Sequence, residues 1–365
     1  IRLSLVGSEM CIRDRFDNSR FRIEEKESII IDPQQRVMLE LSQDAIESAG
    51  YKDLSDQVVG VFVGADQMAY QEMITSQFYR SNTIDYLSKT EAFKNLSPEI
   101  KETLQPEMDA LRKLHPLPPD SLVGVLPNMI PGRIAHVLNL KGPALTVDTA
   151  CSSALVAVHL AIQSLNRFEC NQALAGGVNL NLTPSVFQYM SAAGVISPSG
   201  KCIPFSKNSD GILLGEGAGM ILLKRLEDAQ RDNDPIWAVI QGSGINNDGR
   251  SLGIMAPSWK GQLALLKNTY EKSGIDPANI SAIEAHGTST RIGDGVELSV
   301  IERFFPLDPN NPITVGSVKS NFGHTLAASG IAGLLKMILA IHHKQLPPSI
   351  HEEIDSKKKL SEKGI

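Results

Sequence analysis

The chain has 365 residues, of which 42% are hydrophobic and 21% are charged. These fractions are close to the averages for globular domains and exclude a disordered, collagen-like or low-complexity chain. The 35 basic and 41 acidic residues give a net charge of −6, so the composition offers no basic field for a nucleic-acid backbone. The length is that of one large domain or of two ordinary ones.

The four cysteines form neither a CxxC pair nor a dense framework, which favours a reducing, cytoplasmic compartment. The longest apolar run, residues 331–341, is interrupted by Lys336 and is too short to cross a bilayer. The first residues lack the continuous apolar core of a signal peptide. We therefore expect a cytoplasmic protein without a membrane span.

The beginning of the chain has no regular pattern. Residues 1–15 show neither helical nor strand periodicity, and the run over 4–15 resembles translated sequencing-adapter sequence. We expect a non-native leader over 1–15 and native sequence from Phe16 onward.

The first clear element is a helix between Asp32 and Gly50. Asp32 suits the N-cap position, Pro33 suits the first helical position, and Gly50 suits the residue after the end. A short buried strand is predicted next, over 58–63. Residues 65–121 are polar, and we expect a solvated insertion there with a surface helix around 98–114.

The rest of the chain alternates strand and helix patterns, which predicts an α/β fold with a largely covered sheet. The strand-like runs are 144–147, 172–175, 219–223, 236–240, 280–285 and 313–315, and the helical runs are 153–165, 261–273 and 325–343. A charged boundary over 224–234 divides the chain, and we expect one half over 16–225 and a second half over 226–365.

Cys151 follows the 144–147 strand after a tight connection over 148–150, and it stands at the start of the next helix. The positive end of a helix dipole stabilises a thiolate, and a strand-to-helix turn of this kind is the geometry of a nucleophile elbow. From spacing alone, a buried structural cysteine is an equally good interpretation. Cys170 and Cys202 lack such a setting, and we interpret both as inert.

Two histidines occupy comparable junctions. His286 follows the 280–285 strand and opens a Gly-Thr-Ser-Thr loop, while His324 stands near a helix start with Lys319 five residues earlier. A thiolate nucleophile needs a neighbouring base or cation, and two imidazoles could also donate hydrogen bonds to one oxyanion. An ordinary loop histidine remains an alternative for His286. The wide separation of Cys151 from both histidines argues against a zinc site.

Five segments together resemble the β-ketoacyl synthase domains of polyketide synthases. They are DPQQR (32–36), DTACSSALVAVHLA (148–161), AGGVN (175–179), EAHGTST (284–290) and GSVKSNFGHT (316–325). The resemblance runs from about residue 30 to 351. It implies a thiolase-type fold, a layered αβαβα arrangement of two similar halves, and usually a homodimer. It also implies an acyl carrier protein bearing a phosphopantetheine arm, and neighbouring synthase domains.

The resemblance also assigns roles to residues. Cys151 would carry the acyl chain as a thioester, while His286 and His324 would promote decarboxylation of a malonyl-type extender and stabilise the oxyanion. Lys319 would support the second histidine electrostatically. The reaction would be a decarboxylative Claisen condensation in polyketide biosynthesis, with no metal or redox cofactor.

Thr288 and Thr290 match positions that contact the pantetheine arm, and the residue between them departs from the family. Ser289, Gly295 and Ser206 stand where Gly, Pro and Asp are usual. The opening strand and the closing Gly-rich loop of the family have no counterpart in this sequence, and the insertion over 65–121 is longer than expected. If Ser289 keeps the positive φ of a glycine turn, Ser289→Gly should relieve strain.

Three other functions compete with this interpretation. A condensing domain of fatty-acid or polyunsaturated-lipid synthesis would share the same residues. A non-elongating domain would transfer acyl chains without condensing them, although such domains commonly lack the histidine found here as His286. A Cys-His acyl hydrolase would use water as the acceptor.

Overall fold

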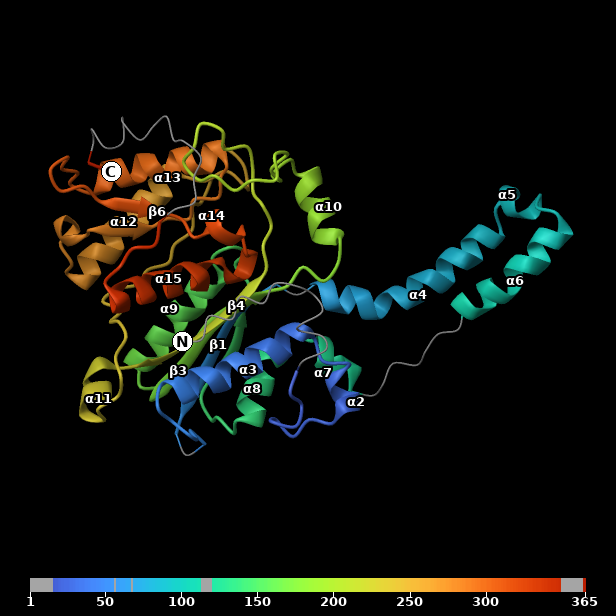
Figure 1. The fold of residues 1–365 in the computed structure, drawn as a ribbon, viewed down its shortest axis with the longest axis horizontal. Coiled ribbons are helices and arrows are strands. Elements are labelled where there is room, and N and C mark those ends of the chain that lie inside the picture. The colour runs from blue at the N-terminus through green and yellow to red at the C-terminus, as the bar shows by residue number, and fades with distance from the viewer. Residues whose placement is uncertain (1–15, 56, 67, 113–119, 349–363) are drawn as a thin grey trace.

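Two β-sheets and three layers of helices alternate through the body of the protein (Figure 1). The computed structural model describes residues 16–348, apart from 56, 67 and 113–119, together with 364 and 365. The predicted leader, residues 1–15, lies outside the described residues and stays a prediction.

The first sheet has the strand order β2-β1-β3-β4. Its strands are β1 (Val59–Ala65), β2 (Ala144–Val147), β3 (Gln172–Asn179) and β4 (Gly217–Lys224). Strand β1 is parallel to β2 and β3, with Val61 paired to Ala144 on one side and to Leu174 on the other, and β4 closes the sheet antiparallel to β3. Strand β2 has the predicted bounds, β1 is shifted by one or two residues at each end, and β3 and β4 are longer than predicted.

One face of this sheet is covered by α3 (Pro33–Ser48) and α8 (Met129–Val137), whose apolar side chains pack on Val59, Val61 and Val63 of β1. The predicted ends of α3 are confirmed. The Asp32 carboxylate accepts the backbone N–H of Gln34 at 2.8 Å, and Gly50 adopts a φ of +88° just beyond the helix.

The other face is covered by α9 (Ser153–Asn166) and α15 (Ser329–His343), which follows a short 3-10 turn, η2 (Leu326–Ala328). These two helices cross closely, because a Cβ at Gly330 would lie 2.6 Å from the Leu155 side chain. The stretch Leu326–His343 is long and apolar enough to cross a membrane by length and composition, which corrects the expectation of a shorter run. Half of it is buried, and it contacts β3, β4 and α9 as a core helix does.

The second sheet is formed by β5 (Ala282–Glu284) and β6 (Thr314–Gly316), which are parallel. On one side α15 contacts β5, and on the other α12 (Trp259–Ser273) and α13 (Arg291–Phe304) enclose a third apolar cluster. The order of layers is therefore α3/α8, first sheet, α9/α15, second sheet, α12/α13. This confirms the predicted αβαβα arrangement.

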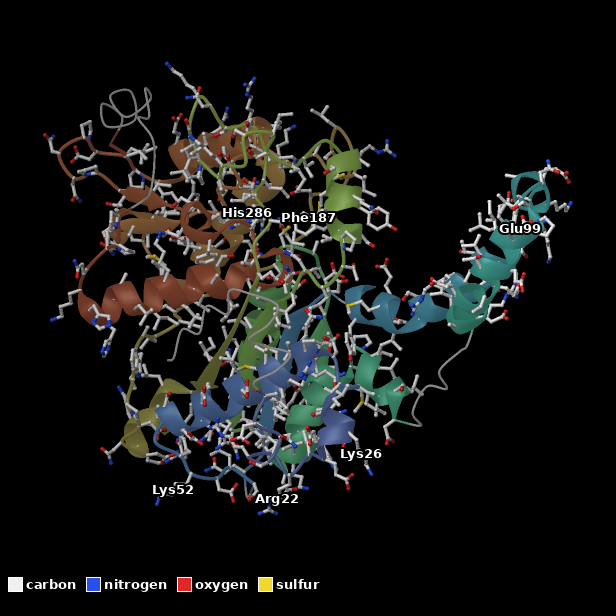
Figure 2. All side chains as sticks on the ribbon, turned by 45° about the vertical axis from the view of Figure 1, so that its right-hand side comes forward. Arg22, Lys26, Lys52, Glu99, Phe187 and His286 are labelled. Carbon is white, nitrogen blue, oxygen red and sulfur yellow. The ribbon has the colours of Figure 1, made fainter. Side chains whose placement is uncertain are left out.

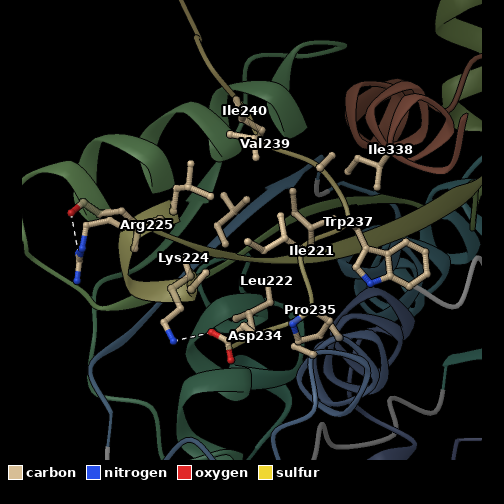
Figure 3. Close-up of a pocket in the computed structure, with 18 of the residues that line it drawn as sticks. Ile221, Leu222, Lys224, Arg225, Asp234, Pro235, Trp237, Val239, Ile240 and Ile338 are labelled. Atoms are coloured by element: carbon tan, nitrogen blue, oxygen red, sulfur yellow. Dashed lines mark hydrogen bonds and ion pairs between the residues drawn. The ribbon is translucent and has the colours of Figure 1, made fainter. Parts of the chain in front are cut away.

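The prediction of a strand over 236–240 is wrong. Within the described part of the chain this segment joins no β-ladder. Its apolar side chains instead pack beside β4, where they line a cavity of about 290 Å³ (Figure 3). The Lys224 ammonium holds Asp234 at 2.6 Å at the rim of this cavity. The segment is only partly buried, since Ile236 and Val239 remain 44% and 48% exposed.

The insertion forms an arm that projects from the body (Figure 1). It consists of α4 (Met68–Ser88), α5 (Glu91–Lys94) and α6 (Pro98–Arg112). Helix α6 is the predicted surface helix, whereas α4 was not predicted. An ion pair of 2.9 Å between Arg112 and Asp85 joins α6 to α4, and at the base Glu72 accepts a hydrogen bond of 2.6 Å from Ser185.

The remaining described elements are short. They are α2 (Glu25–Ser28), α7 (Ser121–Val125), α10 (Ser185–Ala192), α11 (Leu226–Arg231), α14 (Lys319–Phe322) and η1 (Pro277–Asn279).

Candidate active site

A sharp turn between β2 and α9 presents Cys151. Ala150 has a φ of +53°, so the chain reverses just before the cysteine. The buried Ser153 at the start of α9 fastens this turn, since its hydroxyl accepts the Thr149 N–H at 2.8 Å and donates to the Ala150 carbonyl at 2.6 Å. The side chain of Cys151 is half-buried at the N-terminal end of α9.

The backbone of His324 is held on both sides. Its N–H donates to the Leu213 carbonyl at 2.6 Å, and its carbonyl accepts the Gly215 N–H at 3.0 Å. Gly323 makes this approach possible, because it has a φ of +81° and a Cβ there would lie 2.6 Å from the Leu213 oxygen. The imidazole of His324 is therefore placed by the segment that leads into β4.

The ring of His324 reaches Cys151. Its Nε2 lies 3.1 Å from Sγ, and its Nδ1 accepts the Leu326 N–H at 3.2 Å. Because Nδ1 is an acceptor, the neutral ring carries its proton on Nε2 and donates it toward the sulfur. Burial, with the positive charge of Lys319, lowers the pKa of His324 to about 3. His324 is thus a neutral hydrogen-bond donor at pH 7.

His286 lies beside His324, with the two ring centroids 5.4 Å apart and the planes nearly perpendicular. Figure 2 shows it in the body of the protein, far from Glu99 at the end of the arm. The residue is exposed to solvent, yet protein atoms surround its ring closely enough to desolvate it. This loss of hydration, followed by the charge of Lys319 and by His324, holds the pKa of His286 well below its usual value.

A carboxylate fixes the loop of His286. Glu297 on α13 accepts the backbone N–H groups of His286 at 2.6 Å and Gly287 at 2.8 Å. Burial raises the pKa of Glu297, while these two hydrogen bonds lower it. The Ser317 hydroxyl donates to the Gly287 carbonyl at 3.1 Å from the other side. Sequence reasoning missed Glu297, because a glutamate in a helix gives no local signal of this contact.

Lys319 is the cation at the centre of the site. It is only 3% exposed, and burial lowers its pKa, whereas the charges of Glu297 and Glu284 raise it. Glu284 accepts the Val318 N–H at 2.6 Å and forms an ion pair of 2.5 Å with Lys336. Glu284 lies in the EAHGTST motif, but its partners are far away in the chain. Sequence reasoning therefore did not assign it.

The electrostatic setting of Cys151 differs from the expectation. Burial raises the pKa of the Cys151 thiol, although the Lys319 charge lowers it in part. The histidines do not lower the pKa of the thiol as expected, because both imidazole rings are neutral. Burial also raises the pKa of Cys202, to about 11. Solvent exposure, rather than a lowered pKa, therefore distinguishes Cys151 from the buried Cys170 and Cys202.

Thr288 and Thr290 stand on the loop that His286 opens. Their hydroxyl oxygens lie 3.0 Å apart, and Gly293 leaves room for them, since a Cβ there would lie 2.5 Å from the Thr290 hydroxyl. Ser289 between them has a φ of +64°, so the turn keeps the backbone conformation of a glycine.

Two family models match this chain. "Beta-ketoacyl synthase, N-terminal domain" matches residues 6–229, and "Beta-ketoacyl synthase, C-terminal domain" matches residues 237–353. The chain belongs to the β-ketoacyl synthase family. The predicted division between residues 225 and 226 lies close to the gap between the two matches.

Among known proteins, the chain is similar to polyketide synthases. It is 41% identical over 353 residues to one component of the phenolphthiocerol/phthiocerol polyketide synthase of Mycobacterium tuberculosis, covering 95% of this chain and 17% of that protein. It is 38% identical over 355 residues to erythronolide synthase EryA3 of Saccharopolyspora erythraea, covering 95% and 10%.

Solved ketosynthases share the fold. The ketosynthase from module 6 of the bacillaene synthase of Bacillus subtilis 168 has a TM-score of 0.75 and 37% identity, with 94% of this chain and 54% of that chain covered. The ketosynthase domain OzmH KS7 of Streptomyces albus has a TM-score of 0.77 and 30% identity, with 94% and 55% covered. The chain therefore spans about half the length of these solved ketosynthases.

As a β-ketoacyl synthase, the chain brings its predicted site residues together. The ligand atoms of Cys151, His286 and His324 lie within 4.8 Å of one another, which is also close enough to share a metal ion. A metal would need the lone pair of the His324 Nε2 atom, and that atom carries the proton because Nδ1 accepts the Leu326 N–H. The arrangement therefore fits hydrogen-bond donors better than metal ligands.

Proposed function

We propose that the chain catalyses a decarboxylative Claisen condensation that lengthens an acyl chain by two carbons during polyketide assembly. The observation that carries this proposal is the Nε2 atom of a neutral His324, 3.1 Å from the Cys151 sulfur, with His286 beside it. The similarity to polyketide synthases favours polyketide assembly over lipid synthesis.

The first step loads the acyl chain. The Cys151 sulfur attacks the carbonyl carbon of an acyl thioester, a new S–C bond forms, and the S–C bond to the carrier breaks. The thiol proton passes to the departing carrier sulfur. Because the thiolate is the attacking form and burial raises the pKa of the Cys151 thiol, the thiol must lose its proton as the new bond forms.

The second step forms the carbon–carbon bond. A malonyl-type thioester loses its carboxylate as CO2, and the electron pair forms an enolate whose oxygen accepts hydrogen bonds from the imidazoles of His286 and His324. The enolate carbon attacks the acyl carbonyl on Cys151, the C–C bond forms, and the Cys151 S–C bond breaks. The released thiolate then takes a proton from water. Neutral donors suit this step because they stabilise the enolate without protonating it.

The substrates would arrive on an acyl carrier protein whose phosphopantetheine arm contacts the Thr288 and Thr290 hydroxyls. The steps above need no resident metal or redox cofactor. Since the curated relatives are several times longer than this chain, we also propose neighbouring synthase domains in the same assembly line. Such a protein would act in the cytoplasm.

The edge of the first sheet supports a homodimer. Strand β2 is the outermost strand, its outer backbone groups face no described strand, and Leu145 on it is 47% exposed. A second copy related by a two-fold axis could pair with this edge. Sedimentation analysis of the wild type and of Leu145→Glu tests this proposal. A dimeric wild type and a monomeric variant would support it, and a monomeric wild type would contradict it.

The decisive experiment incubates the protein, at the length in which it is naturally expressed, with an acyl thioester and malonyl carrier protein, and follows all species by mass spectrometry. We expect acyl-Cys151 and a β-ketoacyl carrier two carbons longer. Cys151→Ala should abolish loading yet leave some malonyl decarboxylation, because the histidines stabilise the enolate. Release of free acid would instead indicate a hydrolase, and transfer without lengthening would indicate a non-elongating domain.

A further inference from the structure

Ser289 has an unusual conformation at the centre of the site. Its side chain is fully buried, and its φ of +64° lies in the left-handed region, which residues with a Cβ adopt only at a cost. The flanking Thr288 and Thr290 bring their hydroxyls within 3.0 Å of each other. Interactions with the rest of the protein must therefore stabilise this turn.

Ser289 accepts two hydrogen bonds from a distant loop, residues 203–211. The Ser289 hydroxyl accepts the backbone N–H of Ile203 at 3.0 Å, and the Ser289 carbonyl accepts the N–H of Gly211 at 2.9 Å. One residue thus fastens the 203–211 loop to the His286 loop across 86 positions of sequence.

Further contacts hold the 203–211 loop against the His286 loop and against α13, the helix that follows it. Phe205 has a φ of +61°, and its N–H donates to the buried Asp294 carboxylate at 2.6 Å. Its ring lies over Gly287, where a Cβ would approach the ring edge to 3.2 Å. Gly287 follows His286, so the 203–211 loop packs directly behind the histidine.

We propose that Ser289 is a positioning residue for the pantetheine-bearing substrate. It acts through the backbone: its hydroxyl and carbonyl hold the left-handed turn, and this turn keeps the hydroxyls of Thr288 and Thr290 on the substrate side. The inference rests on the proposed function. Glycine at this position can adopt the positive φ of the turn without strain, but it has no side-chain acceptor for the Ile203 N–H. Alanine lacks that acceptor as well, and its Cβ makes the positive φ costly.

The experiment compares three variants. Ser289→Ala and Ser289→Gly both remove the hydroxyl that accepts the Ile203 N–H. The alanine keeps the Cβ, and the glycine does not. Ser209→Ala is the matched control, because the buried Ser209 hydroxyl donates to the Ile203 carbonyl at 2.8 Å within the 203–211 loop and does not hold the His286 loop. Loading of Cys151 is measured with the same acyl group on pantetheine and on ethanethiol, which lacks the amides of the arm.

The readout is the ratio of the two KM values, ethanethiol ester over pantetheine ester. We expect this ratio to fall about tenfold in Ser289→Ala and about threefold in Ser289→Gly, as for a lost hydrogen bond, with kcat nearly constant. Ser209→Ala should keep the ratio within twofold. If Ser289→Ala does not fold, the Ser289→Gly ratio decides.

A ratio within twofold of wild type in both Ser289 variants would overturn the inference, as would an equal fall in Ser209→Ala. A wild-type protein that is loaded by neither ester would overturn the proposed function, and this inference with it.

Discussion

The Nε2 atom of His324 lies 3.1 Å from the Sγ atom of Cys151, although the two residues are 173 positions apart. The hydrogen bond from Leu326 to Nδ1 leaves the ring proton on Nε2. The histidine therefore donates a hydrogen bond at the sulfur and does not remove its proton. The same proton can serve a carbonyl oxygen that becomes negative during condensation.

His324→Ala should lower the condensation rate by roughly 10²-fold or more, the usual cost of losing one oxyanion donor. The measurement is single-turnover formation of the β-ketoacyl carrier from protein already loaded on Cys151. Loading itself serves as the control, since the Cys151 thiol remains in place. Full condensing activity in His324→Ala would contradict the proposed mechanism.

The stability of the fold should fall as the pH drops below about 6.5. His286 and His324 both have pKa values lowered in the folded state, so the unfolded chain binds protons that the folded chain excludes. Stability is therefore fully present above the ordinary histidine pKa and is lost as the pH falls toward about 3. Urea denaturation at pH 7.5 and pH 5 measures this change.

His324→Gln is the matched variant for this pH dependence, because glutamine does not titrate. It should flatten the pH dependence of the free energy of unfolding between pH 6.5 and 5. An equally steep dependence in the variant would show that other groups dominate.

Brief treatment with iodoacetamide should label Cys151 before Cys170 and Cys202. Cys170 is 1% exposed and Cys202 is 7% exposed, whereas Cys151 is half-buried, so access sets the order. Lys319→Met should slow the labelling of Cys151 at pH 8, because the Lys319 charge lowers the pKa of that thiol. Peptide mass spectrometry gives the order, and preferential labelling of Cys202 would contradict it.

Glu297→Gln should weaken both stability and condensation. The amide can accept only one of the two N–H groups that the carboxylate holds, so the other loses its acceptor, at a cost of about 0.5–1.5 kcal/mol. We expect a lower Tm and a condensation rate reduced about tenfold or more, because His286 loses its fixed position. Glu271→Gln, at an exposed position on α12, is the control and should change neither.

Ser289→Gly should not stabilise the fold, although the positive φ of Ser289 alone predicts relief of strain. The glycine would remove about 1–2 kcal/mol of conformational strain but would also leave the buried Ile203 N–H without its acceptor. Ser289→Ala keeps the strain and loses the hydrogen bond, so it should be the least stable of the three. A Tm for Ser289→Gly clearly above wild type would show that strain dominates.

The sequence by itself determined the parts that depend on neighbouring residues. Asp32, Pro33 and Gly50 predict the ends of α3, because capping is a local property. Cys151, His286 and His324 each stand at a junction between two elements, so short motifs identify them. The alternation of strand and helix patterns likewise predicts an α/β fold.

Only the tertiary structure decided how those residues are charged. A pKa depends on burial and on charges that arrive from distant parts of the chain, and no motif contains them. The neutral state of His324, the raised pKa of Cys151 and the two carboxylates beside Lys319 all arise in this way. For the same reason the apolar pattern over 236–240 wrongly predicted a strand, since a strand requires a partner that only the fold supplies.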